Sequence, residues 1–354
     1  MNTCPDKRNG FTLIRILSAT LVLFTHCYVV LGYNHGDILE RNGYIGLSKI
    51  GLDTFFVISG FLVTQSLFRS DNMSIFIAKR AARLLPALVI LILITVFIVG
   101  PILSTSPSYF SSPETWKYLS LSFIFSSSRV LPGVFEGNPV DVVNGSLWSL
   151  PLEVTCYAVI SILFAMRVLN KKNLSILLLV MLTLHLNDTF NREYLYLYIQ
   201  TILANELGYL FLFGSFLSLF KINNNFNSML IAAPILIILI GFVFYGGNWH
   251  RYAFFYLLLW PITIILICIK LTRFDWLNKY DISYGVYIYG FLCQQILVTY
   301  FPNINSVTLF FIASVLFSYS AGYLSWVFIE KPTIKLCKNM LSGTPKQTSA
   351  STIK

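Results

Sequence analysis

The chain has 354 residues, of which 56% are hydrophobic and only 11% carry a charge, and its mean hydropathy is +0.71. A water-soluble domain carries charges on about a quarter of its residues, so this composition excludes an ordinary soluble protein and indicates a polytopic membrane protein. The net charge of +10 does not indicate nucleic-acid binding, because the basic residues gather at the ends of apolar stretches, mainly on one side of the membrane.

Ten apolar stretches are long enough, or nearly so, to cross a bilayer as helices, which takes about 20 apolar residues. In chain order these predicted spans cover residues 11–33, 45–68, 84–103, 146–168, 173–187, 195–220, 229–246, 252–270, 281–301 and 306–329. The fifth span is the shortest. The predicted fold class is therefore all-α, a transmembrane helical bundle of about ten spans.

The distribution of basic residues sets the predicted orientation of these spans. Of the 25 lysine and arginine residues, 18 fall on the side that holds both termini, six on the other side, and one, Arg15, inside the membrane. Cytoplasmic segments carry an excess of Lys and Arg, so both termini are predicted to be cytoplasmic. The chain then divides into a cytoplasmic N-terminal segment, one transmembrane domain with a long extracytoplasmic loop, and a cytoplasmic tail, at residues 1–10, 11–330 (loop 104–145) and 331–354.

The first span contains two ionisable residues, Arg15 and His26. They are eleven residues apart, so on a helix they share one face and lie about 16 Å apart along its axis. An ionisable side chain inside a membrane is costly and by default marks a functional site or a buried partner. These residues and the length of the span are unlike those of a cleavable signal peptide, so the span is expected to be retained.

Other spans carry charged residues at matching depths. Asp53 in the second span and Glu153 in the fourth lie about 10–12 Å below the outer surface, which is also the predicted depth of His26. Arg80 and Arg83 stand at the cytoplasmic entrance of the third span and, being three residues apart, share a helix face. Acidic and basic side chains therefore fall into an outer and a cytoplasmic layer.

This layering has a direct chemical interpretation. Guanidinium groups bind phosphates in a bidentate manner, so the cytoplasmic arginines suit a phosphate-bearing donor. A histidine further in can act as general base on a hydroxyl, and a carboxylate beside it would orient its ring. The pattern is typical of group transfer across a membrane, but a proton-coupled transporter would use the same residues. Each residue alone also fits a structural role, such as a packed histidine or a basic membrane anchor.

The cysteine pattern adds no further site. The six cysteines form no CxxC pair and no spacing typical of metal ligands. We therefore expect no metal site, no disulfide framework and no permanently bound cofactor.

Six sequence blocks add a family resemblance. In chain order they are Arg15 with His26, GLDTFFVISGFLVT (51–64), AKRAARLLPAL (78–88), GSLWSLPLEVTCY (145–157), ISYGVYIYGF (282–291) and FIEKP (328–332). They resemble, in the family's own order, the motifs of acyltransferase family 3, integral membrane enzymes that acylate sugars, lipids and other surface molecules. Many members carry a histidine after the SYxxY block, where this chain reads Tyr289-Gly290-Phe291, so no second catalytic histidine is expected.

The resemblance implies a membrane-bound O-acyltransferase of the bacterial inner membrane. An acyl-CoA, with acetyl-CoA as the expected co-substrate, would bind from the cytoplasm. Its acyl group would pass to a hydroxyl of a surface polysaccharide or of its lipid-linked precursor. Acylation of a lipid, a protein or a small molecule is the alternative within this class.

The motifs also imply roles for individual residues. His26 is expected to be the general base, or to carry a transient acyl group, with Asp53 or Glu153 orienting it. The donor would be held by Arg15, Arg80 and Arg83. Further pocket candidates are Ser59, Trp148, Ser149, Tyr157, Ser283, Tyr284, Tyr287 and Glu330. The long loop shows no sugar-binding signature, although four of its aromatic residues could stack on a sugar: Tyr109, Trp116, Tyr118 and Phe123.

Overall fold

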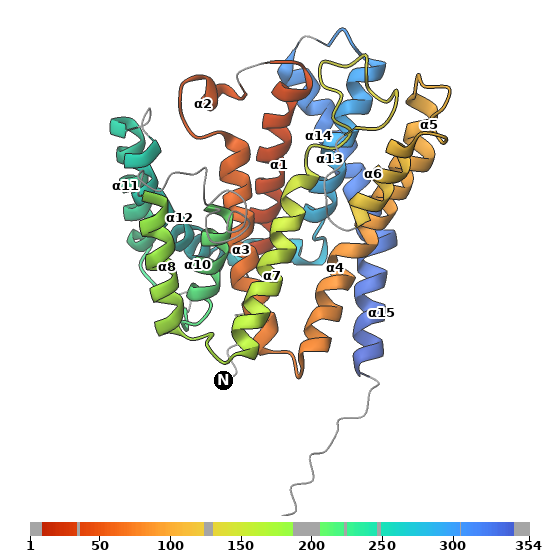
Figure 1. Cartoon of the computed structure of the whole chain (residues 1–354). Coiled ribbons are helices and arrows are strands. Elements are labelled where there is room, and N and C mark those ends of the chain that lie inside the picture. Colours follow the sequence, from red (N-terminus) through yellow and green to blue (C-terminus); the bar gives the residue numbers. More distant parts are fainter. Residues whose placement is uncertain are drawn as a thin grey trace, which may run out of the picture.

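The computed structural model describes residues 9–33, 36–123, 130–186, 206–222, 225–245, 249–304 and 306–342. Every regular element in this part of the chain is a helix, so the predicted all-α class is confirmed. The helices form one bundle, and the start of α1 and the end of α15 point towards the same end of it (Figure 1). Several predicted segments lie partly outside the described residues: most of the N-terminal segment 1–10, residues 124–129 of the long loop, the start of the sixth span, and the tail beyond residue 342.

The described helices carry the labels of Figure 1. They are α1 (Phe11–Val30), α2 (Ile38–Arg41), α3 (Leu47–Phe68), α4 (Met73–Ile94), η1 (Thr95–Val99), α5 (Gly100–Leu103), α6 (Pro113–Phe123), η2 (Leu147–Ser149), α7 (Leu150–Ala165), α8 (Lys171–Leu186), α10 (Glu206–Leu217), α11 (Met229–Tyr245), α12 (Trp249–Lys270), η3 (Thr272–Lys279), α13 (Ser283–Tyr300), α14 (Val307–Ser325), η4 (Trp326–Glu330) and α15 (Lys331–Ser342).

Six helices in the described part of the chain are long and apolar enough to cross a membrane. They are Phe11–Val30, Leu47–Phe68, Met73–Leu103, Leu147–Ala165, Ala253–Lys270 and Val307–Leu341. A seventh results if η3 and α13, which meet at 67°, are counted as one broken span. Each of the ten predicted spans overlaps a helix, but some of these helices are shorter than a full crossing. The multi-pass architecture is therefore confirmed, and the count of ten remains a prediction.

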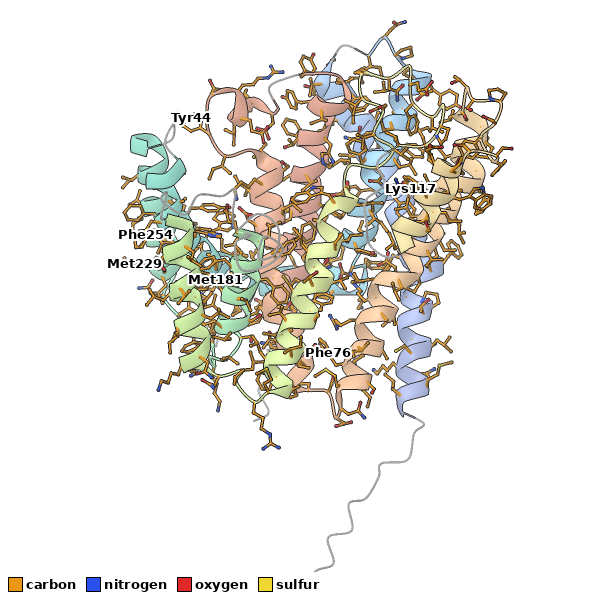
Figure 2. The ribbon with its side chains drawn as sticks, in the orientation of Figure 1. Tyr44, Phe76, Lys117, Met181, Met229 and Phe254 are labelled. Carbon is orange, nitrogen blue, oxygen red and sulfur yellow. The ribbon has the colours of Figure 1, made fainter. Side chains whose placement is uncertain are left out.

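The outer surface of the bundle is apolar, as a lipid-facing surface requires. Met229 on α11 is 71% exposed and Phe254 on α12 is 40% exposed, and both point away from the bundle (Figure 2). Similar exposed leucine, isoleucine and phenylalanine side chains occur on α4, α7 and α14. In water such a surface would promote aggregation; in a bilayer it is solvated by the acyl chains.

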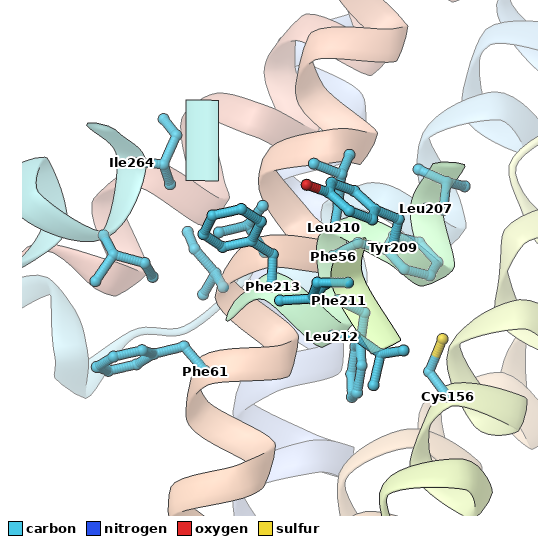
Figure 3. Close-up of a cluster of buried hydrophobic side chains, with 14 of the residues drawn as sticks. Phe56, Phe61, Cys156, Leu207, Tyr209, Leu210, Phe211, Leu212, Phe213 and Ile264 are labelled. Atoms are coloured by element: carbon cyan, nitrogen blue, oxygen red, sulfur yellow. The ribbon is translucent and has the colours of Figure 1, made fainter. Parts of the chain in front are cut away.

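Helices α1 and α3 form the centre of the bundle. Helix α1 packs against α3, α13 and α14, while α3 packs on its other side against α10 and α12. Buried aromatic residues of both helices, such as Phe56 and Phe211, belong to one hydrophobic cluster (Figure 3), and Phe61 of α3 stacks on Phe11 of α1. Because α1 and α3 are held from both sides, the polar side chains that they carry have fixed positions.

Two glycines let α3 and α10 approach at backbone distance. A Cβ atom on Gly60 would collide with the carbonyl oxygen of Phe211, and one on Gly214 would collide with the carbonyl oxygen of Val57. The hydroxyl of Ser215 donates a hydrogen bond of 3.2 Å to the carbonyl of Gly60. Small residues at helix contacts are typical of membrane bundles, where close packing drives association.

We expect Gly60→Ala to destabilise the protein by about 1–3 kcal/mol, because the added methyl group has no room and must push the two helices apart. The measurement is the thermal unfolding midpoint of the purified protein in one detergent. Gly137→Ala is the matched control, since a Cβ atom there meets nothing within 4 Å. Equal midpoints for the two variants would show that the helices are not in this close contact.

Candidate active site

Helices α1, α3, α4, α7 and α13 surround a cavity with an empty volume of about 710 Å³, counting its open mouth, and with a mixed apolar and polar lining. The structure brings together nine of the residues predicted from the sequence, which line the cavity: Arg15, Ser59, Arg80, Arg83, Ser149, Glu153, Tyr157, Tyr284 and Tyr287. We call this cavity the arginine pocket.

Two of the three arginines are neutralised by carboxylates. Arg15 Nη1 and Arg83 Nη2 each lie 2.7 Å from the same oxygen, Oδ2, of Asp281. Arg83 Nη1 also lies 3.3 Å from Oε2 of Glu330, whose side chain is fully buried and accepts a hydrogen bond of 3.1 Å from Ser325. Two positive and two negative charges therefore balance inside the bundle.

Asp281 holds this charge cluster together from the turn between η3 and α13, at the start of the predicted ninth span. The guanidinium groups of Arg15 and Arg83 stabilise its ionised form. The hydroxyl of Ser283 stabilises the same form by donating to Oδ1 at 2.7 Å. Asp281 therefore serves as a counter-charge, and Ser283 acts through it rather than in the pocket.

Arg80 differs from the other two arginines. Its Nη2 donates to the hydroxyl of Ser66 at 3.3 Å, and its guanidinium carbon lies 5.9 Å from the ring centroid of Phe76. Its Nε is buried and has no hydrogen-bond partner. Within the described residues no carboxylate lies within ion-pair distance of Arg80, and Glu153 acts on its charge only from across the pocket. Arg80 can therefore bind an anion directly without displacing a paired carboxylate.

Glu153 on α7 is the acidic residue that faces into the arginine pocket. Its Oε1 accepts hydrogen bonds from Ser59 at 2.9 Å and from Tyr157 at 2.5 Å. On the neighbouring wall, the hydroxyl of Tyr287 lies 2.6 Å from that of Ser149. The hydroxyl groups of four residues therefore line part of the arginine pocket: Ser59, Ser149, Tyr157 and Tyr287.

His26 lies beyond the arginine pocket on α1 and does not line it. Its ring meets the ring of Phe291 edge to face, with centroids 5.1 Å apart. Phe291 is one helical turn beyond Tyr287 on α13, so His26 stands one turn further along the bundle than the wall of the pocket. In the part of the chain that is described, neither Asp53 nor Glu153 is hydrogen-bonded to His26, and its role as a base remains a prediction.

Asp53 belongs to a separate charged cluster on the opposite side of α3. Its fully buried carboxylate lies 2.9 Å from Lys49 Nζ and accepts a hydrogen bond of 2.8 Å from Tyr256 on α12. Lys49 also pairs with Glu206 at the start of α10. Asp53 is thus held by α10 and α12 and does not share the surroundings of His26.

Two other groups of predicted residues take different positions. Trp148 is 43% exposed and lies outside the lining of the pocket. In the long loop, Tyr109 and Tyr118 are 5% and 1% exposed, and Tyr109 donates to the carbonyl of Val96. The expectation that these two tyrosines stack on a sugar is therefore wrong, because their rings are packed into the core; the side chain of Phe123 lies outside the described residues.

Sequence reasoning missed Asp281 and Ser66. Asp281 directly precedes the apolar run of α13, in a polar turn where a carboxylate is common and does not by itself indicate a site. A signal was present nonetheless, because three arginines at the same membrane depth require counter-charges. Ser66 carried no such signal, since a serine in an apolar helix is common.

Comparisons with known proteins agree with the sequence motifs. A family profile described as "Acyltransferase domain" matches residues 8–327. The chain is 31% identical to the "O-acetyl transferase" of Shigella phage Sf6, over 92% of this chain and 96% of that protein. It is 24% identical to "Nodulation protein 10" of Rhizobium leguminosarum bv. viciae, over 95% of both chains. No solved structure matches the chain.

We expect Asp281→Asn to lower the stability by about 3–5 kcal/mol, because Arg15 would lose the carboxylate that pairs with it in the described structure and Arg83 would keep only Glu330. Thermal unfolding in detergent measures the change. Asp71→Asn serves as control, since Asp71 is exposed in the turn between α3 and α4. A similar midpoint for both variants would contradict the proposed structural role of Asp281.

Proposed function

Because this chain belongs to acyltransferase family 3, we propose that it transfers an acetyl group from cytoplasmic acetyl-CoA to a hydroxyl of a surface polysaccharide or of its lipid-linked precursor. The chain is an O-acyltransferase with membrane-spanning helices. The choice of acetyl rests on the relative from Shigella phage Sf6, an O-acetyl transferase that aligns over nearly the whole chain. The proposed location is the bacterial inner membrane, with both termini in the cytoplasm.

The proposed binding of acetyl-CoA rests on one observation: no carboxylate is paired with Arg80 in the described structure. A guanidinium buried without a carboxylate costs free energy unless an anion binds to it. Phosphate oxygens suit the fork of an arginine, and CoA carries several phosphate groups. Since Arg15 and Arg83 are already neutralised, Arg80 and the neighbouring hydroxyl of Ser66 are the groups that would bind a CoA phosphate.

The acyl transfer would take place near His26. The acceptor hydroxyl oxygen attacks the carbonyl carbon of the thioester, the carbon–sulfur bond breaks, and CoA leaves as a thiolate. His26 accepts the hydroxyl proton as the new bond forms and then gives a proton to the thiolate, so the products are the ester and free CoA. The apolar contact of His26 with Phe291 would keep out water that competes with the acceptor.

Glu153 has a positioning role in this proposal. Its carboxylate holds the hydroxyls of Ser59 and Tyr157 in the wall of the arginine pocket, where they would contact the arm of the donor that leads towards His26. Asp53 is left out of the reaction, because Lys49 and Tyr256 already bind it on the far side of α3.

We expect His26→Gln to lower the rate of acetyl transfer about 10²–10⁴-fold, because a general base contributes about that factor. The assay uses purified protein with labelled acetyl-CoA and polysaccharide, and follows both the released thiol and the labelled glycan. His185→Gln on α8 is the control, and it should retain transfer. If His26→Gln keeps the wild-type rate, His26 is not the base.

We expect Arg80→Ala to raise the KM for acetyl-CoA about tenfold or more, since a charge-assisted hydrogen bond contributes about 1.5–3 kcal/mol. Initial rates at several acetyl-CoA concentrations give the value. Arg69→Ala is the control, because Arg69 ends α3 and bonds only to the carbonyl of Gln65 in the described structure. An unchanged KM in Arg80→Ala would remove Arg80 from the donor site.

A further inference from the structure

A second cleft lies where α1 and α13 end. It has a volume of about 1320 Å³, counting its open side. The loop segment 133–139 forms one wall, and the ends of α1 and α13 form the other. In Figure 1 the loop and the end of α13 lie at the top of the bundle, at the opposite end from α15.

The cleft continues the line that leads from the arginine pocket to His26. Leu31, which lines the cleft, is five residues beyond His26 and so about 7.5 Å further along the axis of α1. Val298 lines it from α13, about 10.5 Å beyond Phe291, the aromatic partner of His26. His26 therefore lies between the two cavities.

The polar lining of the cleft consists of neutral hydrogen-bonding groups and one carboxylate. Glu136 is exposed to the cleft, and its two oxygens accept hydrogen bonds from Gly133 N at 3.2 Å and from Thr105 at 3.3 Å. Asn138 and Thr299 are bonded to each other at 3.2 Å. Among the described residues that line the cleft there is no lysine or arginine, so the lining favours a polyhydroxylated neutral ligand over a phosphate.

Tyr33 supplies an aromatic surface at the same cleft. This residue is 38% exposed. Its ring packs against the ring of Tyr28, with centroids 5.8 Å apart, and the guanidinium carbon of Arg41 lies 4.9 Å from its centroid. An aromatic ring that is fixed but half exposed offers an apolar face to a flat ligand. One face of a sugar ring, which presents C–H groups, matches such a surface.

The loop wall is rigid. Phe135 has a φ of 63° and Gly133 a φ of 70°, left-handed conformations that for a bulky residue such as phenylalanine require support from the surroundings. Support comes from α13, where the side chain of Gln295 donates to the carbonyl of Val140 and accepts from Asn138. The cleft is thus formed before any ligand binds, which lowers the entropic cost of binding.

From these observations we propose that the cleft is the acceptor subsite, which binds a neutral sugar residue through Tyr33 and Glu136 and presents one of its hydroxyls towards His26. This inference rests on the proposed function and adds the place and the chemistry of acceptor recognition. Glu136 accepts hydrogen bonds from sugar hydroxyls, and Tyr33 stacks on the sugar ring. A glycan carried on a lipid and a free glycan present the same groups to this cleft.

The test compares Tyr33→Ala and Glu136→Gln with wild-type protein in the full-length, detergent-purified form. Initial rates are measured at several concentrations of a lipid-linked oligosaccharide and of the matching free oligosaccharide, each with saturating acetyl-CoA. We expect both variants to raise the KM for both acceptors about tenfold and to leave the KM for acetyl-CoA unchanged. A KM difference between the two wild-type acceptors would measure how much the lipid contributes.

Phe110→Ala and Glu114→Gln are the matched controls, an exposed aromatic residue and an exposed carboxylate of the same loop that do not line the cleft. They should keep wild-type values of both constants. If the two cleft variants also keep the acceptor KM within about twofold, the acceptor binds elsewhere and the inference fails. If the wild-type protein acetylates no saccharide at all, the proposed function itself fails, so the two failures are distinguishable.

Discussion

Guanidinium groups buried inside an apolar bundle impose the constraint on which this structure depends. They are tolerated only where anions or hydrogen-bond acceptors meet them. Arg15 and Arg83 satisfy this requirement by sharing Asp281, and Arg83 also binds Glu330. These four residues come from α1, α4, the turn before α13, and η4. One neutral cluster thereby fixes helices that are far apart in the sequence beside the arginine pocket.

Because of this cluster, Arg80 and Arg83, the two arginines of one sequence motif, have different surroundings. Arg83 is paired with two carboxylates, whereas Arg80, three residues earlier, has Ser66 and Phe76 as its direct contacts and Glu153 as a carboxylate in the same pocket. A substrate anion would have to displace Asp281 at Arg83 but no directly paired carboxylate at Arg80 in the described structure. The structural role of Arg83 and the proposed donor-binding role of Arg80 are therefore separated by less than one turn of helix.

Much of this arrangement could be predicted from membrane depth alone. The position of each charged residue within its apolar stretch predicted its depth in the membrane. The three arginines predicted at a similar depth do meet in one pocket. Depth does not say which way a side chain faces around its helix. Asp53 and Ser59 are six residues apart, which is about 240° of rotation, so Ser59 reaches Glu153 while Asp53 turns towards Tyr256. The number of spans was uncertain for a similar reason, since short apolar helices are stabilised by neighbours that the sequence does not identify.

The arginine pocket and the second cleft lie at different levels of the bundle and share no lining residue in the part of the chain that is described. Between them, Val22, Leu23, Cys27 and Phe291 are each no more than 3% exposed. Moving one elementary charge across a membrane potential of 100 mV changes its free energy by about 2.3 kcal/mol. A continuous water-filled passage here would therefore discharge the ion gradients of the cell. Passing an uncharged acyl group requires no such passage. The packing around Phe291 would therefore prevent ions from crossing the membrane while the proposed acyl transfer takes place.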